Sequence, residues 1–320
     1  MLTTLSFIRC SSIGFLLLIL LSVPPSSQAA SFQDTQSIFA PSLSNPPSPP
    51  SPEVAAQYQR AYSLLFNPHS SPDYTSALPL LRLSASQHFA PAEFLLGYLY
   101  NHGQGVPLDY AQAAEHYRAA ATLGHPGGEN NLGGLYQYGR GVPKDIHRAF
   151  QYYRAAAEHG NVMGEYNLAT FYRLGYATPP DAVEAAKWFR AAADQGLASA
   201  QANLAWFYFQ GTGVPIDYAQ SAHYARLAAD QGLPHAAINY AYLCEHGMGV
   251  SRDYLAAYLW YSRAVARGDK SAASPLKSVA HHLSREQLQQ ANAQLDADAS
   301  HSQPPDAASA NGDITLFEHP

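Results

Sequence analysis

Few residues of the chain combine types and spacing that could support catalysis. Ser274 and Lys277 form a Ser-x-x-Lys pattern, which supplies the nucleophilic serine in penicillin-recognising enzymes. The Ser-Asp-Asn and Lys-Thr-Gly elements that accompany this motif are missing from the sequence. Because a pattern with two fixed positions often arises by chance, we predict a non-enzymatic protein with no catalytic residue. An envelope hydrolase or a peptidoglycan/penicillin-binding activity is kept as the alternative hypothesis.

Metal, cofactor and redox chemistry have little support in the sequence. The 14 His include the pair His281-His282, but no His/Glu or Cys/His spacing suits a metal site. Cys10 falls in the expected leader and Cys244 in the repeat interior, so we expect a small core residue and no disulfide. The Gly-x-Gly loops follow expected helices, not strands, which disfavours phosphate binding. We therefore predict no metal and no cofactor.

Composition and the N-terminus limit the partners and the location. The formal net charge is −6, only 13% of residues are charged, and no Lys/Arg run occurs, which disfavours nucleic acid and anionic membranes as partners. Residues 1–30 resemble a signal peptide with the short apolar stretch Ile13–Leu21 and a cleavage site near Ala29/Ala30. An uncleaved anchor is the alternative, but a bilayer needs about 20 apolar residues. We expect a secreted or periplasmic protein (ER lumen if eukaryotic) without stable membrane insertion.

Regular columns of residues recur every 36 positions and indicate a repeated two-helix unit. Leu and Tyr four residues apart predict one face of a first helix, for example Leu96 and Tyr100. A Gly such as Gly103 ends that helix in a left-handed conformation, and an Asp such as Asp109 caps the second helix. Because one such unit cannot bury its apolar face alone, the units must stack. The fold class predicted is all-α: an α/α solenoid of 36-residue helix-turn-helix repeats.

The domain boundaries follow from this period. A Ser/Pro-rich segment is expected to be disordered, and the terminal units are atypical, as capping repeats are. The predicted segments are 1–30 signal peptide, 31–52 disordered linker, 53–88 degenerate N-terminal repeat, 89–268 five repeats, 269–296 C-terminal capping helices and 297–320 disordered tail.

The repeated pattern closely resembles the Sel-one-like repeat (SLR) family, a relative of tetratricopeptide repeats. It is Ala-x-x-x-Leu-Gly-x-x-Tyr-x-x-Gly-x-Gly-Val-x-x-Asp-x-x-x-Ala-x-x-aromatic-Tyr-x-x-Ala-Ala-x-x-Gly, and it recurs in register over about two-thirds of the chain. The resemblance implies a right-handed superhelix that acts as an adaptor or scaffold, often in secreted or envelope proteins. One repeat departs from the pattern, because Gly175-Tyr176-Ala177-Thr178 replaces Gly-x-Gly-Val, and the form of its loop stays open.

Tetratricopeptide geometry would place the first helices along a concave groove. Several positions there vary between repeats, as a ligand surface would, and aromatic and Arg side chains are typical anchors of protein interfaces. The predicted groove residues are Phe94, Tyr98, Tyr138, Tyr166, Arg173, Trp206, Phe209 and Tyr242. We expect one or more proteins or peptides as partners. The opposing interpretation, that these rings pack between repeats, has equal weight.

Two further columns and the tail have competing interpretations. Asn131, Asn167, Asn203 and Asn239 could bind a ligand, but structural hydrogen bonds are favoured for an amide column of constant identity. An Arg column at 118, 154, 190 and 226 is interpreted as solvated ion pairs, because acids lie four residues after the last three of these arginines. The C-terminal motif Ile314-Thr315-Leu316-Phe317 is an alternative docking point.

Overall fold

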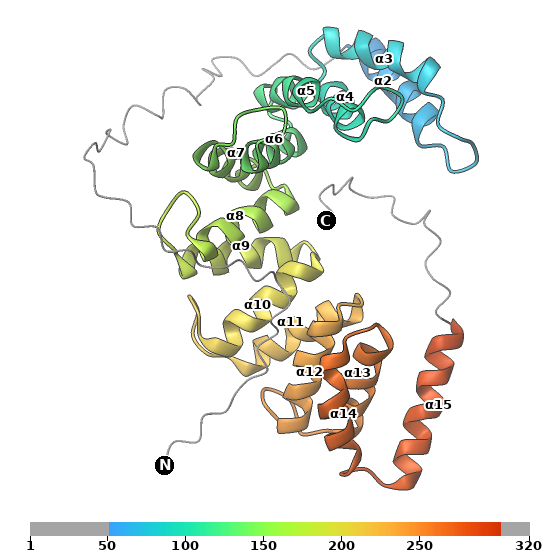
Figure 1. Ribbon diagram of the computed structural model, residues 1–320, viewed down its shortest axis with the longest axis vertical. Helices are drawn as coiled ribbons and strands as arrows, with labels where there is room; N and C mark the ends of the chain where they lie inside the picture. Colours follow the sequence, from blue (N-terminus) through green and yellow to red (C-terminus); the bar gives the residue numbers. More distant parts are fainter. Residues whose placement is uncertain (1–50, 302–320) are drawn as a thin grey trace. The chain divides into compact units, whose positions relative to one another are not determined.

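The computed structural model describes residues 51–301, with side chains to residue 298, and this part of the chain is an all-α solenoid. Figure 1 shows its helices following one another in chain order. The first helices of the five central repeats are α4 Ala90–His102, α6 Pro126–Tyr138, α8 Val162–Leu174, α10 Ala198–Gln210 and α12 Pro234–His246. The second helices are α5 Tyr110–Thr122, α7 Ile146–Glu158, α9 Ala182–Asp194, α11 Tyr218–Asp230 and α13 Tyr254–Ala266.

From α3 to α13, each helix packs against the helix before it and the helix after it. The pairs α4·α5 and α6·α7 form single repeats, and α5·α6 and α7·α8 join one repeat to the next. First helices also contact each other directly, as α4·α6 and α6·α8 do. The apolar face that one pair leaves uncovered is therefore buried by its neighbour, which makes stability a sum over repeats and their interfaces.

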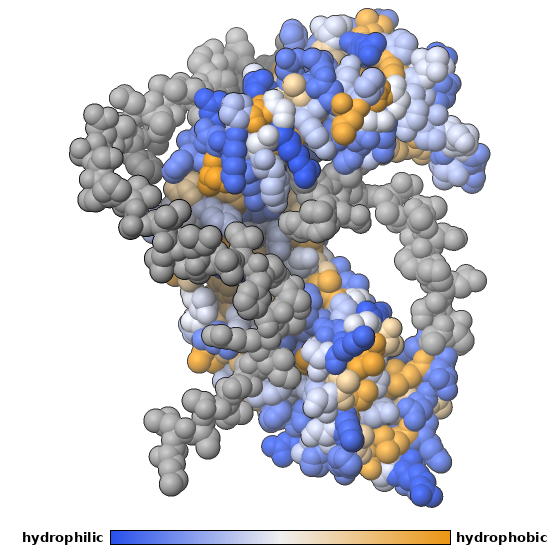
Figure 2. All heavy atoms as spheres, viewed as in Figure 1, coloured by the Kyte–Doolittle hydropathy of each residue, from blue (hydrophilic) through white to orange (hydrophobic). Residues whose placement is uncertain are grey.

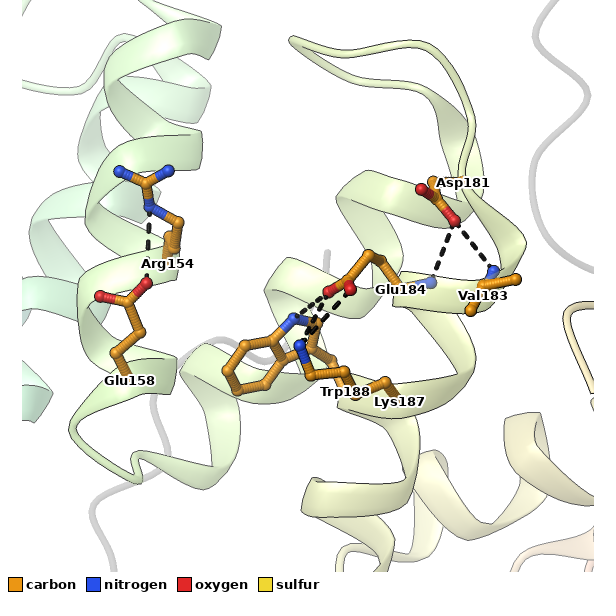
Figure 3. Close-up of polar contacts among 7 residues, drawn as sticks. All are labelled: Arg154, Glu158, Asp181, Val183, Glu184, Lys187 and Trp188. Atoms are coloured by element: carbon orange, nitrogen blue, oxygen red, sulfur yellow. Dashed lines mark hydrogen bonds and ion pairs between the residues drawn. The ribbon is translucent and has the colours of Figure 1, made fainter.

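The predicted caps are confirmed at every central repeat. Gly103 ends α4 in the left-handed region with φ 62°, and the four equivalent glycines end α6, α8, α10 and α12 in the same way. The Asp of each unit accepts a hydrogen bond from a first-turn amide. Asp181 accepts from the Val183 and Glu184 N–H groups, each at 3.0 Å, as Figure 3 shows. These caps pair amides and carbonyls that a short helix leaves open.

A second glycine in each loop lies against the preceding repeat. Gly213 has φ 69°, and a Cβ there would overlap the backbone of Ala182 at the start of α9. The divergent repeat has Ala177 at this position and still adopts φ 63°. The loop left open by the sequence thus keeps the conformation of its neighbours, with an alanine in a region that favours glycine.

The interior of the repeats combines small and aromatic side chains. Ala120, Ala156, Ala192, Ala228 and Ala264 form one fully buried column, so neighbouring helices approach closely. Tyr153, Phe189 and Tyr261 fill the space between helices of a pair with at most 2% exposure. Cys244 is 3% exposed in the same core, as predicted, and burial raises the pKa of its thiol.

The solenoid ends in atypical helices. At the N-terminal end are α2 Pro52–Leu65 and α3 Tyr74–Ser86, where Asp73 keeps the capping role. At the C-terminal end are a 3₁₀ turn Lys270–Ala272, α14 Ala273–Ala280 and α15 Arg285–His301, which runs past the predicted end at Asp296. The predicted signal peptide, most of the predicted linker, and residues 302–320 lie outside the described residues. Within 51–301, no helix is long and apolar enough to cross a membrane.

Candidate interaction surface

Three of the predicted groove residues come together on neighbouring repeats. The Trp206 and Phe209 rings stack with centroids 6.0 Å apart, and Phe209 meets Tyr242 edge-on at 6.3 Å. Tyr218 from α11 lies 5.5 Å from Phe209, and His246 stacks on Tyr242 at 4.1 Å. We call Trp206, Phe209, Tyr218, Tyr242 and His246 the aromatic cluster. It joins α10, α11 and α12, and it presents an indole that is 38% exposed.

Two other predicted groove residues make packing contacts. Phe94 stacks on His125 at 4.5 Å and lies 5.9 Å from Tyr117. Tyr166 lies 5.7 Å from Phe189, the buried ring of its own second helix. Both Phe94 and Tyr166 are half-buried. These contacts are the ones expected from the alternative in which the rings pack between helices.

The remaining three predicted residues lie apart from the aromatic cluster. Tyr98 lies 4.6 Å from His102 and is half-buried, and this burial raises the pKa of its hydroxyl. Tyr138 is 45% exposed, with the Arg140 guanidinium 5.5 Å from its ring centroid. Arg173 is exposed on α8 and makes no hydrogen bond or ion pair with any residue from 51 to 298.

Part of the variation along the first helices has an intramolecular cause. The Tyr153 hydroxyl donates to Gln137 Oε1 at 2.6 Å, and sixteen residues likewise separate Tyr261 from its acceptor, Glu245 Oε2, at 3.0 Å.

Where the tyrosine of this pair is replaced by Phe189, which has no hydroxyl, the acceptor position holds the exposed cation Arg173. Where it is replaced by Ala225, the same position holds Phe209, which packs against the core cluster that contains Ala225. In the first central repeat Tyr117 and Asn101 hold these two positions, but no hydrogen bond joins their side chains. The column thus follows the second helix in part, and its variation alone does not indicate a ligand.

The Asn and Arg columns serve mainly as internal contacts. Asn167 donates to Asn130 Oδ1 of the preceding repeat at 2.9 Å, and Asn203 donates to the Ser199 carbonyl at 2.8 Å. Of the predicted ion pairs, Arg154–Glu158 and Arg226–Asp230 form at 3.7 Å, the first drawn in Figure 3. The other two arginines instead donate to tyrosine hydroxyls of the next repeat, in the pairs Arg118–Tyr136 and Arg190–Tyr208.

In three successive repeats a polar pair that the sequence patterns did not reveal joins the first helix to the end of the second. His159 Nδ1 lies 2.8 Å from Glu129 Oε2, and Gln195 donates to Glu165 at 2.9 Å. Gln231 donates to Gln201 at 2.8 Å in the next repeat. In all three pairs the partners are 30 residues apart, a spacing that could have been recognised from the constant period. The first-helix members are at most 5% exposed, and burial raises the pKa of both glutamates.

The residues of the enzymatic alternative are exposed on the surface of the C-terminal cap. Ser274 and Lys277 lie one turn apart on α14, and no hydrogen bond joins their side chains. Among residues 51–298, no group of three or more His, Cys, Asp or Glu could hold a metal ion.

On the face seen in Figure 2, hydrophobic residues gather over α13 and α14 while most of the remaining surface is hydrophilic.

Fold and surface together define a tandem-repeat α-solenoid with an aromatic cluster that spans two neighbouring repeats. The Sel1 repeat model matches residues 90–125, 126–161, 162–197, 198–233 and 234–269, and the chain belongs to the Sel1 repeat family. Sel1 repeat proteins generally mediate protein–protein interactions. No curated protein matches the chain.

Solved structures that are similar over the repeats include two other proteins with this repeat. A protective antigen of uropathogenic Escherichia coli strains, which displays an SLR fold, is 33% identical with a TM-score of 0.66. The similarity covers 71% of this chain but 48% of that one, so the chain spans about half the length of this relative. A Sel1 repeat protein from Oxalobacter formigenes is 29% identical with a TM-score of 0.61, covering 70% of this chain and 87% of that chain.

Proposed function

We propose that this protein is a non-catalytic scaffold, exported to the periplasm or the medium, that binds a segment of a partner protein at the aromatic cluster. The carrying observation is the continuous set of rings from Trp206 through Phe209 to Tyr242, which joins two repeats. Rings held in place by one another lose little conformational entropy on binding, and Trp and Tyr are frequent energetic centres of interfaces. Membership of an interaction repeat family supports the same function.

The cluster favours an extended segment with apolar side chains over a strongly charged ligand. Its five members are rings, and the nearest fixed cation in the repeat register is Arg173, one repeat earlier. A clamp for a terminal carboxylate needs several clustered Lys or Arg side chains. The first helices α4, α6, α8, α10 and α12 together contain only one Lys or Arg side chain, that of Arg173.

Selection of peptides on the purified mature chain tests the proposal. A random displayed library is enriched on the wild-type protein, and the binders are then measured on Trp206→Ala/Tyr242→Ala. Loss of a central Trp costs about 2 kcal/mol or more, so affinity should fall roughly 30-fold or further. Val183→Ala, which removes a side chain that is 65% exposed on α9, is the matched control and should leave binding unchanged.

Helical circular dichroism of all three proteins provides the folding control. Equal binding by the double variant and the wild type would refute the assignment of the cluster. Loss of binding in Val183→Ala would refute it as well.

Export rests on the N-terminal sequence and needs its own test. Residues 1–30 have the apolar stretch and small-residue site of a signal peptide. The mature protein recovered from the host's envelope or medium should therefore begin near Ala30, as read by N-terminal sequencing. A full-length chain that starts at Met1 and stays in the cytoplasm would contradict this part of the proposal.

A further inference from the structure

The C-terminal segment of the chain has the chemistry that the aromatic cluster and its surroundings would recognise. Within residues 302–320, the apolar run Ile314-Thr315-Leu316-Phe317 stands between Asp313 and Glu318, in an otherwise polar sequence. The segment thus combines an aliphatic and aromatic centre with negative ends. It lies outside the described residues.

The receiving surface is complementary to that segment in both polarity and charge. The rings of the aromatic cluster offer an apolar platform. Leu174 on α8 is a further apolar side chain in this region, and it is 43% exposed. Arg173 occupies on α8 the register position that Phe209 occupies on α10. Its guanidinium is exposed and makes no ion pair within residues 51–298, whereas Arg148, Arg154 and Arg263 each have an acidic partner there.

The end of the described chain is close enough for the segment to reach the cluster. Tyr258 bonds to Asn292 and Arg263 to Asp298, so α15 runs parallel to α13 and ends beside the C-terminal end of that helix. Residues 302–313 span about 40 Å when extended, at roughly 3.3 Å each. Helix layers lie about 8–10 Å apart, so the three steps from α13 to α10 need about 30 Å. The cluster lies at the C-terminal ends of α10 and α12, one helix length or about 20 Å along the axis from the end of α13. The two displacements combine to about 36 Å, which is within reach of the extended segment.

We propose that the aromatic cluster is occupied by the chain's own C-terminal segment Asp313–Glu318, with Leu316 and Phe317 against the rings and an acidic end facing Arg173. This inference rests on the proposed function, because the same cluster would receive the partner. The tail then acts as an internal competitor. A partner segment then binds with an apparent Kd equal to its intrinsic Kd divided by the fraction of time for which the tail has left the surface.

Photo-cross-linking in the full mature chain tests the contact. A benzoylphenylalanine in place of Thr315 should cross-link to residues 198–248 of the same chain, as mapped by mass spectrometry. The cross-link should disappear with Trp206→Ala and with Leu316→Asp/Phe317→Asp, weaken severalfold with Arg173→Glu, and persist with Val183→Ala. A mixture of light and ¹⁵N-labelled chains separates contacts within one chain from contacts between two chains.

Three results would overturn the inference: no cross-link, cross-links to other parts of the solenoid, or cross-links mainly between chains. The last result would assign the segment to a second copy of the protein. A peptide selected on the wild-type chain provides a second readout. If the tail occupies the cluster nine-tenths of the time, Leu316→Asp/Phe317→Asp should bind that peptide about tenfold more tightly.

Equal peptide affinity in the tail variant and the wild type would refute tail occupancy. The scaffold function would survive that outcome as long as peptide binding still requires Trp206. Loss of the Trp206 requirement would instead refute the proposed function itself. The two proposals can therefore fail separately.

Discussion

Ala177 and Gly213 provide a matched pair of substitutions at one position of the repeat. Both residues stand two places after the glycine that ends a first helix, and both have positive φ, 63° and 69°. The five central repeats have glycine at four of the equivalent loop positions and alanine at one. Ala177→Gly should therefore stabilise the protein, and Gly213→Ala should destabilise it.

The expected magnitudes come from the backbone and from the space around each Cβ. An L-residue in the left-handed region costs about 1–2 kcal/mol, and glycine loses about 0.5–1 kcal/mol through its greater freedom when unfolded. Ala177→Gly should thus gain about 0.5–1 kcal/mol. Gly213→Ala incurs the left-handed penalty and also drives a Cβ into the Ala182 carbonyl. Overpacking adds about 1–3 kcal/mol, for a total loss of roughly 2–4 kcal/mol.

Urea unfolding followed by circular dichroism gives the change in global stability. Repeat arrays can open locally, so hydrogen exchange should also be followed in α8 and α9 for Ala177→Gly and in α10 and α11 for Gly213→Ala. Protection should rise in the first case and fall in the second. A destabilising Ala177→Gly, or a neutral Gly213→Ala, would refute the argument from φ and close approach.

Three further changes test the caps, the polar pair of Glu165 and the hydrogen bond between Tyr153 and Gln137. Asp217→Ala removes the acceptor of two first-turn amides of α11 and should cost about 1 kcal/mol in urea unfolding, whereas Gln220→Ala should change little. Glu165→Gln should stabilise the protein at pH 7. Burial raises the pKa of Glu165, so its contribution is fully favourable below the unfolded value of about 4.3 and is lost as pH rises through the folded value. Melting curves from pH 4 to 8 should converge at the acid end, and a gain that persists there would contradict this sign. Tyr153→Phe leaves the Gln137 acceptor without its donor and should cost about 1–2 kcal/mol. A double-mutant cycle with Gln137→Ala should show coupling, and additive effects would refute the pairing.

The fold could be predicted from the sequence because its determinants are local and repeated. A left-handed glycine and a capping aspartate act within a few residues of their own position, and five copies in register remove the ambiguity of any one copy. The divergent loop at Ala177 shows the limit of this inference. Its sequence left the conformation open, and the packing of the neighbouring repeats imposes the same backbone on a less suitable residue.

The contacts of the candidate site were harder to predict from the sequence, because the residues that touch are far apart along the chain. Phe94 and Tyr166 stand at repeat positions that were predicted to line the groove. Their rings instead lie against His125 and Phe189. Predicting these contacts requires the offset between the two helices of a pair. Once the structure supplies that offset, the same period locates the equivalent contacts wherever both residues are polar: Glu129 pairs with His159 thirty residues later, as Glu165 does with Gln195.

Variation between repeats therefore has two physical origins that can be separated position by position. Gln137 and Glu245 each accept a hydrogen bond from a tyrosine of the second helix, which gives both side chains an internal role. Trp206 differs in that it stacks on Phe209 of the same helix and keeps 38% of its surface exposed within a continuous set of rings. An exposed aromatic patch is typical of an interaction site. Trp206 is therefore the residue whose replacement should affect binding most.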